Sequence, residues 1–150
     1  MTTTIRPVLR VLTDAECRAL LARHRVGRIA YSHRDRVDIE PVTFAYDGNW
    51  VFCRTSVGSK LSTLAHNPWC AFEVDEVHAM FDWTSVVVKG SFHLLDPELG
   101  SPDTYRRAFT LLSALVPGTF SSNDPVPHRT ILFGIHTAEI TGRTSSTDRE

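Results

Sequence analysis

DIEPVTFAYDGNWVFCRTSVGSKLSTLAHNPWCAFEVD, residues 38–75, is the stretch from which the fold of this chain can be predicted. Two runs rich in β-branched and aromatic residues, 39–46 and 50–55, lie on either side of Asp47-Gly48-Asn49. The glycine supplies the positive φ that a tight turn requires. Two such runs joined by such a turn predict a β-hairpin.

The end of the second strand carries the groups that bind a phosphate. Arg54 can fork two donors onto phosphate oxygens, and Lys60 supplies a compact positive charge. The hydroxyls of Thr55 and Ser59 can also donate, and a short helix is predicted to begin at Ser59, where backbone N–H groups are unpaired. This combination indicates a phosphate site. The alternative is a strand that ends on a solvated arginine, with Ser59 as an ordinary helix cap.

The chain before the hairpin predicts a third strand over residues 26–32, so that three strands follow in quick succession as a meander. Pro41 lies inside the middle strand, where it cannot donate a hydrogen bond to a neighbour. It therefore predicts a strand edge or a bulge. An open edge of this kind suits a flat ligand that lies against the backbone.

The remaining pattern predicts a mainly β protein with about three helices, an α+β chain whose many short antiparallel strands favour a barrel over a doubly wound sheet. Further strands are expected over residues 69–75, 84–95 and 130–142, and helices after the Thr13–Glu16 capping box, over 59–67 and after Ser101-Pro102. Residues 1–10 are expected to be a flexible arm and residues 144–150 a disordered tail.

Composition places the chain among single-domain globular proteins, because its length of 150 residues suits one core. A net charge of −1 gives no electrostatic reason to bind nucleic acid or an anionic membrane. No apolar run approaches the ~20 residues of a spanning helix. Cys17, Cys53 and Cys70 are odd in number and lack C-x-x-C spacing, which favours reduced thiols in a cytoplasmic protein over disulfides or zinc.

Residues 40–76, followed by W-T-S-V-V-V-K-G at 83–90, resemble the pyridoxamine 5'-phosphate oxidase-like superfamily of FMN-binding split β-barrels. The nearest branch is that of small actinobacterial and nitroimidazole-reductase-like members. The resemblance covers about residues 12–143. It rests on the motifs P-V-x-F, R-T-x-x-G-S-K-L and S-V-V-V-K-G.

This resemblance implies an antiparallel split barrel that forms a homodimer, with FMN at the two-fold interface and a small molecule as substrate. The implied cofactor-binding residues are Arg54, Thr55, Ser59 and Lys60 for the phosphate, Pro41, Val42 and Thr43 for the isoalloxazine ring, and Trp83 and Ser85 from the second protomer.

No residue pattern identifies a catalytic group. The seven histidines show no H-E-x-x-H motif, and no metal site is expected. A flavin carries its own redox chemistry, so the protein needs only to orient it and to supply donors. His78 is the one weak candidate, because it lies in a predicted irregular link between Asp75 and Trp83, where a substrate can approach the ring.

The C-terminus departs from the true pyridoxamine-phosphate oxidases, because it reads T-S-S-T-D-R-E and lacks their Trp and Arg segment. We therefore expect an FMN-dependent oxidoreductase that reduces a small planar acceptor and does not oxidise vitamin B6. Two alternatives remain: a deazaflavin-dependent reductase, for which Arg34 and Arg36 would extend a basic groove, and a non-catalytic flavin- or haem-binding protein. The sequence names neither the electron donor nor the physiological substrate.

Overall fold

The computed structural model of the chain describes residues 5–56, 58–98 and 100–149, without the side chains of Ser59, Asp148 and Arg149. These residues form seven strands and three helices. In chain order the elements are β1 (Ile5–Val11), α1 (Asp14–Arg23), β2 (Val26–His33), β3 (Arg36–Tyr46), β4 (Trp50–Thr55), α2 (Ser59–His66), β5 (Trp69–Ala79), β6 (Asp82–Leu95), α3 (Pro102–Leu115) and β7 (Ile131–Arg149).

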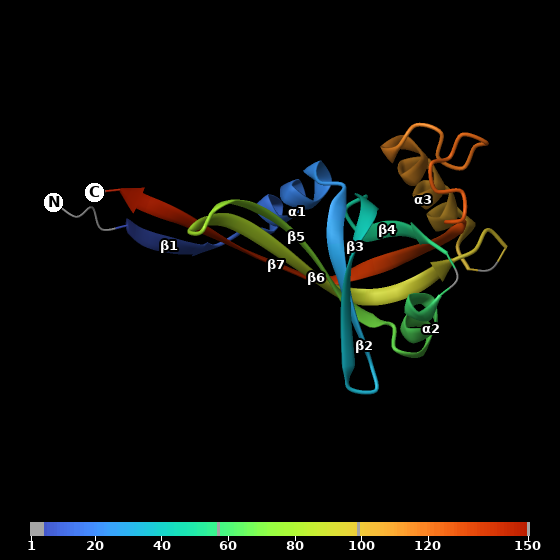
Figure 1. The fold of residues 1–150 in the computed structure, drawn as a ribbon, viewed down its shortest axis with the longest axis horizontal. Coiled ribbons are helices and arrows are strands. Elements are labelled where there is room, and N and C mark those ends of the chain that lie inside the picture. Colours follow the sequence, from blue (N-terminus) through green and yellow to red (C-terminus); the bar gives the residue numbers. More distant parts are fainter. Residues whose placement is uncertain (1–4, 57, 99, 150) are drawn as a thin grey trace.

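The strands form an antiparallel ring. Their order in the sheet is β1-β7-β4-β3-β2-β5-β6, and an additional pairing of β7 with β6 closes the sheet on itself. The first strand lies outside this ring and pairs with the last part of β7. The sheet confirms the predicted antiparallel barrel with helices around it (Figure 1).

The predicted disorder of the C-terminal tail is wrong for the residues described, whereas the predicted N-terminal arm is extended and forms the strand β1. β7 continues to Arg149, and β1 pairs with it from Ile5 opposite Arg149 to Val11 opposite Arg143. Figure 1 shows the two ends side by side, at the end of an arm that also contains the β5–β6 hairpin. The polar sequence of the tail did not predict this strand, because strands can pair through their backbones at an exposed edge without any pattern of apolar residues.

Local signals set most of the element boundaries as expected. Thr13 accepts from the N–H of Glu16 at 3.2 Å, and Glu16 accepts from the N–H of Thr13 at 3.1 Å, which is the predicted capping box. Ser101 caps α3 with its side chain alone, which accepts from the N–H of Thr104. The cap of α2 is Gly58 in place of Ser59. Among the helices described, none combines the length and the apolar character needed to cross a membrane.

Aromatic side chains fill the inside of the barrel. Phe44, Phe72 and Phe133 are fully buried, and the rings of Phe44 and Phe72 meet edge to face with centroids 4.8 Å apart. Each such side chain contributes roughly 1.5–3 kcal/mol through burial. A second buried cluster joins β3, β4 and β7 to α3 through Ala45, Phe52, Leu132, Ala108 and Leu112. This second cluster holds α3 beside the ends of β3 and β4.

The closure of the ring depends on a close approach at Gly90, next to an irregularity in the β6–β7 register. A Cβ atom on Gly90 would lie 2.2 Å from the backbone oxygen of His136. We expect Gly90→Ala to lower the free energy of unfolding by about 1–3 kcal/mol, because the backbone of β7 has to move. Urea unfolding measures this change. Gly58→Ala is the control, since a Cβ there meets nothing within 4 Å. Equal stability of the two variants would contradict the close approach.

Candidate functional site

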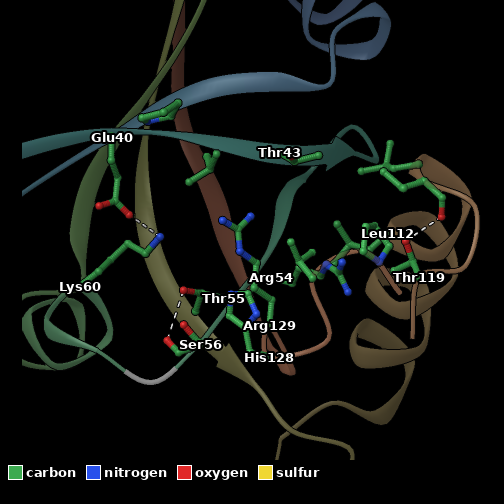
Figure 2. Close-up of a pocket in the computed structure, with 16 residues that line it drawn as sticks. Glu40, Thr43, Arg54, Thr55, Ser56, Lys60, Leu112, Thr119, His128 and Arg129 are labelled. Atoms are coloured by element: carbon green, nitrogen blue, oxygen red, sulfur yellow. Dashed lines mark hydrogen bonds and ion pairs between the residues drawn. The ribbon is translucent and has the colours of Figure 1, made fainter. Parts of the chain in front are cut away.

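A cavity of about 380 Å³ lies between the barrel, α3 and the loop that joins α3 to β7. In Figure 2, Glu40 and Lys60 lie on one side of it and Leu112 and Thr119 on the other. Six of the residues predicted to bind the cofactor line this cavity: Pro41, Val42, Thr43, Arg54, Thr55 and Lys60. The fold therefore brings the predicted ring segment and the predicted phosphate segment to one place.

One wall of the cavity is the backbone of β3. The N–H of Phe44 donates to the oxygen of Arg25 at 2.8 Å, toward β2. Because backbone groups alternate in direction along a strand, those of Pro41 and Thr43 face the opposite side. In the described chain, β4 pairs with β3 at Phe44, Ala45 and Tyr46, and not at Pro41. Pro41 thus lies on an open stretch of β3, as its sequence position predicted.

Arg54 is held by a carboxylate from the loop. Its two terminal nitrogens donate to the two oxygens of Asp124 at 2.6 and 2.8 Å. The side chains of Arg54 and Asp124 are only 11% and 4% exposed. The guanidinium also lies 5.0 Å from the centre of the Phe120 ring. In this structure the donors of Arg54 are therefore directed at Asp124, a partner that the sequence analysis missed.

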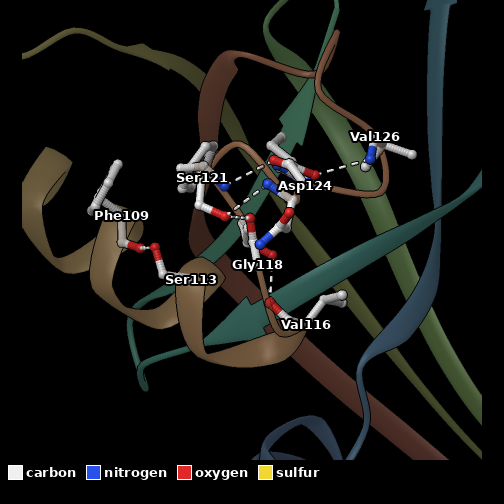
Figure 3. A network of polar contacts seen from close by, with 11 residues as sticks. Phe109, Ser113, Val116, Gly118, Ser121, Asp124 and Val126 are labelled. Carbon is white, nitrogen blue, oxygen red and sulfur yellow. Dashed lines mark hydrogen bonds and ion pairs between the residues drawn. The ribbon is translucent and has the colours of Figure 1, made fainter.

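Asp124 organises the loop around itself, as Figure 3 shows. Its carboxylate accepts from the backbone N–H groups of Phe120 at 2.8 Å and Val126 at 2.9 Å, besides the two bonds from Arg54. The bonds from Arg54, followed by those from the two N–H groups, hold the pKa of Asp124 well below its usual range. The ion pair therefore anchors the loop of residues 116–130 to β4.

Lys60, the other predicted phosphate-binding cation, also has an acidic neighbour. Its ammonium group forms an ion pair with Glu40 of β3 and lies 5.7 Å from the centre of the Phe133 ring. The Lys60 side chain is 16% exposed, and that of Glu40 is 37% exposed. Because Glu40 is partly solvated, an arriving anion can share Lys60 without stranding a buried carboxylate.

Four further groups line the same end of the cavity. Thr55 is buried, and its hydroxyl donates weakly to the oxygen of Ser56 at 3.3 Å. His128 and Arg129 come from the end of the loop, and both are exposed. Sequence analysis missed these two loop residues because no motif surrounds them. The side chain of Ser59 lies outside the described part of the structure, so its predicted role stays a prediction.

The wall opposite β3 is apolar. It consists of α3 and the loop, and its residues are Leu112, Leu115, Val116, Pro125 and Val126. The cavity therefore has a polar, net cationic end and an apolar side. Such an arrangement suits a ligand with an anionic group at one end and a flat, weakly polar body.

The other predicted site residues lie elsewhere. Within the described chain, Trp83, Ser85 and His78 are not among the residues that line the cavity. Ser85 donates to Glu73 at 2.9 Å, and Trp83 pairs with Val77 on β5. His78 does not lie in an irregular link, because β5 continues to Ala79 with a register shift beside His78. The contribution of Trp83 and Ser85 to a second protomer's site stays a prediction.

The cavity offers little chemistry of its own. Burial raises the pKa of Cys53 and of Cys70 to about 12, so both thiols stay protonated near neutral pH. The described residues contain no group of three or more His, Cys, Asp or Glu side chains placed to hold a metal. The cavity is thus arranged to bind and orient a ligand, and the redox chemistry predicted from sequence would have to come from a cofactor.

The anchor at Asp124 makes a prediction about acid stability. The pKa of Asp124 is lower in the folded protein than in the unfolded chain, where it is near 3.9. The ionised carboxylate therefore adds its full contribution to the free energy of unfolding above the unfolded pKa, and this contribution is lost as the pH falls through the folded pKa. We expect Asp124→Asn to be less stable than the wild type at pH 7, with the gap narrowing below about pH 4. Urea unfolding between these pH values measures the gap. A gap independent of pH would contradict the ion pair. Asp103→Asn is the control, since the Asp103 side chain is 87% exposed in its pair with Arg106.

Comparison with known proteins agrees with this architecture. An uncharacterized protein of Rhizobium meliloti (strain 1021) is 29% identical over 145 residues, which cover 90% of this chain and 94% of that protein. The structure of an FAD-binding protein from Mesorhizobium loti matches with a TM-score of 0.75 at 25% identity, over 93% of this chain and 99% of that chain. An FAD-binding protein from Mycobacterium smegmatis shares the fold, with a TM-score of 0.66 at 24% identity over 90% of this chain and 99% of that chain.

A family model supplies the broader relationship. The model described as pyridoxamine 5'-phosphate oxidase matches residues 13–144, which include every residue of the cavity and the β6–β7 pairing as far as Thr144. This match spans most of the chain, and the protein belongs to the pyridoxamine 5'-phosphate oxidase family.

Proposed function

We propose that the protein binds FMN in the cavity beside β3 and passes electrons from it to a small planar acceptor. One observation carries the proposal: the open edge of β3 and the cationic end of strand β4 line a single cavity of about 380 Å³. A flavin has the matching shape, with a flat ring at one end and a phosphate at the other. The relative from Mesorhizobium loti is an FAD-binding protein, which supports a flavin here.

The ring of the flavin would lie along Pro41, Val42 and Thr43. Proline leaves the strand without a donor at its own position, and the backbone N–H of Thr43 faces away from β2. Val42 is 8% exposed, with its side chain packed in the barrel core, so it would offer the ring its backbone alone. This segment would fix the orientation of the ring through backbone contacts.

The phosphate would lie at the cationic end. Lys60 would supply a charge, and the hydroxyls of Thr55 and Ser56 would supply donors just before the beginning of α2. Arg54 was predicted to bind the phosphate directly. Its bidentate pair with Asp124 makes a supporting role more consistent with the structure.

FMN, when bound, supplies reversible electron transfer at its ring. The protein's own part is to hold the phosphate, orient the ring and exclude water. The apolar wall of Leu112, Leu115 and Val116 suits an acceptor that is flat and weakly polar, such as a quinone or a nitroaromatic compound. Pyridoxine phosphate would bring a second phosphate, for which this wall has no donor.

The test begins with the absorption spectrum of the freshly purified protein, which distinguishes flavin, deazaflavin and haem. The bound flavin is then reduced with dithionite without oxygen and mixed with a quinone or a nitroaromatic compound, while the protein with oxidised flavin is mixed separately with pyridoxine phosphate. We expect fast reoxidation of the reduced flavin by the two acceptors and no reduction of the oxidised flavin by pyridoxine phosphate. Efficient formation of pyridoxal phosphate would contradict the assigned acceptor. A protein that neither contains nor binds flavin would contradict the proposal as a whole.

We also propose that the protein is a two-fold dimer with the cavity at its interface. Val37 and Trp69 are 75% and 53% exposed and line an open hollow over β2, β3 and β5. Ile39, which is 68% exposed, lies two residues from Val37 on β3. Exposed apolar groups at this density favour association. Ile39 and Glu40 are neighbours on β3 and point to opposite sides of the strand, so this exposed face and the cavity share one strand.

Sedimentation velocity measures the assembly. We expect a dimer for the wild type and a shift toward monomer for Ile39→Asp, because the carboxylate would be buried in an apolar interface. Thr110→Asp on the exposed face of α3 is the control and is expected to remain a dimer. A wild-type protein that is monomeric and binds flavin would contradict the dimer.

A further inference from the structure

The cationic side chains around the cavity differ in whether an acidic side chain already neutralises them. Arg54 is paired with Asp124, and Lys60 with Glu40. Arg129 lines the same cavity, and among the described residues no ion pair or hydrogen bond engages its guanidinium. Three basic and two acidic side chains therefore leave one net positive charge, and Arg129 is the one of these cations that has no counter-ion in the described part of the chain.

The strand register places Arg129 beside the predicted phosphate segment. β4 pairs with β7 up to Thr55, which lies opposite Ile131. Continued past this pair, the antiparallel register brings the residues just before Ile131 alongside Ser56. Figure 2 shows Arg129 and His128 next to Thr55 and Ser56, between Lys60 and α3. Arg129 thus reaches the phosphate end of the cavity from a chain segment remote from the R-T-x-x-G-S-K motif.

The loop that carries Arg129 is held in place by Arg54. Asp124 receives both donors of Arg54, and the N–H of Val126 donates to Asp124 at 2.9 Å. The N–H of Arg129 in turn donates to the oxygen of Val126 at 3.0 Å. A chain of short contacts therefore runs from Arg54 through Asp124 and Val126 to the backbone of Arg129.

We propose that Arg129 is the arginine that binds the flavin phosphate, and that Arg54 is a positioning residue that acts through Asp124. This inference rests on the proposed binding of a flavin in this cavity. A phosphate monoester carries about 1.5 to 2 negative charges at neutral pH. Arg129 can form two parallel hydrogen bonds to it without breaking an existing pair. Lys60 would supply the second charge.

The same role for Arg54 would be costly. A phosphate that replaced Asp124 would strand a carboxylate whose side chain is 4% exposed. A buried charge that loses its partner is strongly destabilising. Asp124 would also lose both hydrogen bonds from Arg54, whether or not it still accepted those from the backbone N–H groups of Phe120 and Val126. Binding through Arg129 leaves this network intact.

The experiment compares FMN with riboflavin, which has the same ring and no phosphate. We expect Arg129→Ala to weaken FMN binding about tenfold or more, and to leave riboflavin binding nearly unchanged. Arg129→Lys is expected to recover part of the loss, since it restores the charge without the paired donors. Arg106→Ala removes an exposed arginine of α3 and is the control, with both affinities unchanged. FAD, titrated in parallel, shows whether a pyrophosphate is bound by the same arginine.

Asp124→Asn distinguishes the two roles of Arg54 by the sign of the effect. If Arg54 were the phosphate ligand, removal of the competing carboxylate would strengthen FMN binding relative to riboflavin. As a positioning residue, Arg54 would lose its hold on the loop, and the preference for FMN over riboflavin would fall about as far as in Arg129→Ala. The titration is made at neutral pH without urea, under conditions in which circular dichroism shows that the variant is folded.

The outcomes separate this inference from the proposed function. A wild-type protein that binds neither FMN nor riboflavin would contradict flavin binding itself. Wild-type preference for FMN in Arg129→Ala, with normal flavin binding, would overturn the role of Arg129 alone. A stronger preference for FMN in Asp124→Asn would return the phosphate to Arg54.

Discussion

The pairing of β6 with β7 is the interaction on which the rest of this structure depends. It runs from Trp83 opposite Ser145 to Leu95 opposite Leu132 and converts an open sheet into a ring. Its first consequence is the enclosed aromatic core. Its second is the placement of the start of β7 beside β4, which fixes where the preceding loop can lie. The cavity exists because closure brings the loop, α3 and the open stretch of β3 together.

The bond between Arg54 and Asp124 then determines the shape of that cavity. An arginine at a strand end is ordinarily solvated, but here its side chain is 11% exposed and carries the loop of residues 116–130. Without this anchor the apolar wall of Pro125 and Val126 would have no fixed position relative to β3. One buried ion pair therefore decides how much room a ligand has and which loop residues meet its charged end.

The same side chains limit what the protein itself would contribute beside the proposed flavin. The buried thiols are held in their protonated form, and the acidic residues near the cavity are engaged by cations. What the protein offers is a backbone edge for a flat ring, hydroxyls and cations for an anion, and an apolar wall.

The sequence alone determined the local elements: the hairpin around Gly48, the helix caps at Thr13 and Ser101, and the open edge at Pro41. Each of these elements depends on residues within a few positions of one another, so the local sequence pattern is enough to predict it. With the family resemblance, it also grouped six residues of the cavity, because five of them lie on the adjacent strands β3 and β4 and the sixth lies at the beginning of α2. Only the tertiary structure decided which acid neutralises Arg54, since Asp124 lies 70 residues away. The β1–β7 pairing and the position of Arg129 were also decided only by the tertiary structure. Both depend on contacts between segments far apart in the sequence, and closure of the barrel sets such contacts without leaving a local sequence pattern.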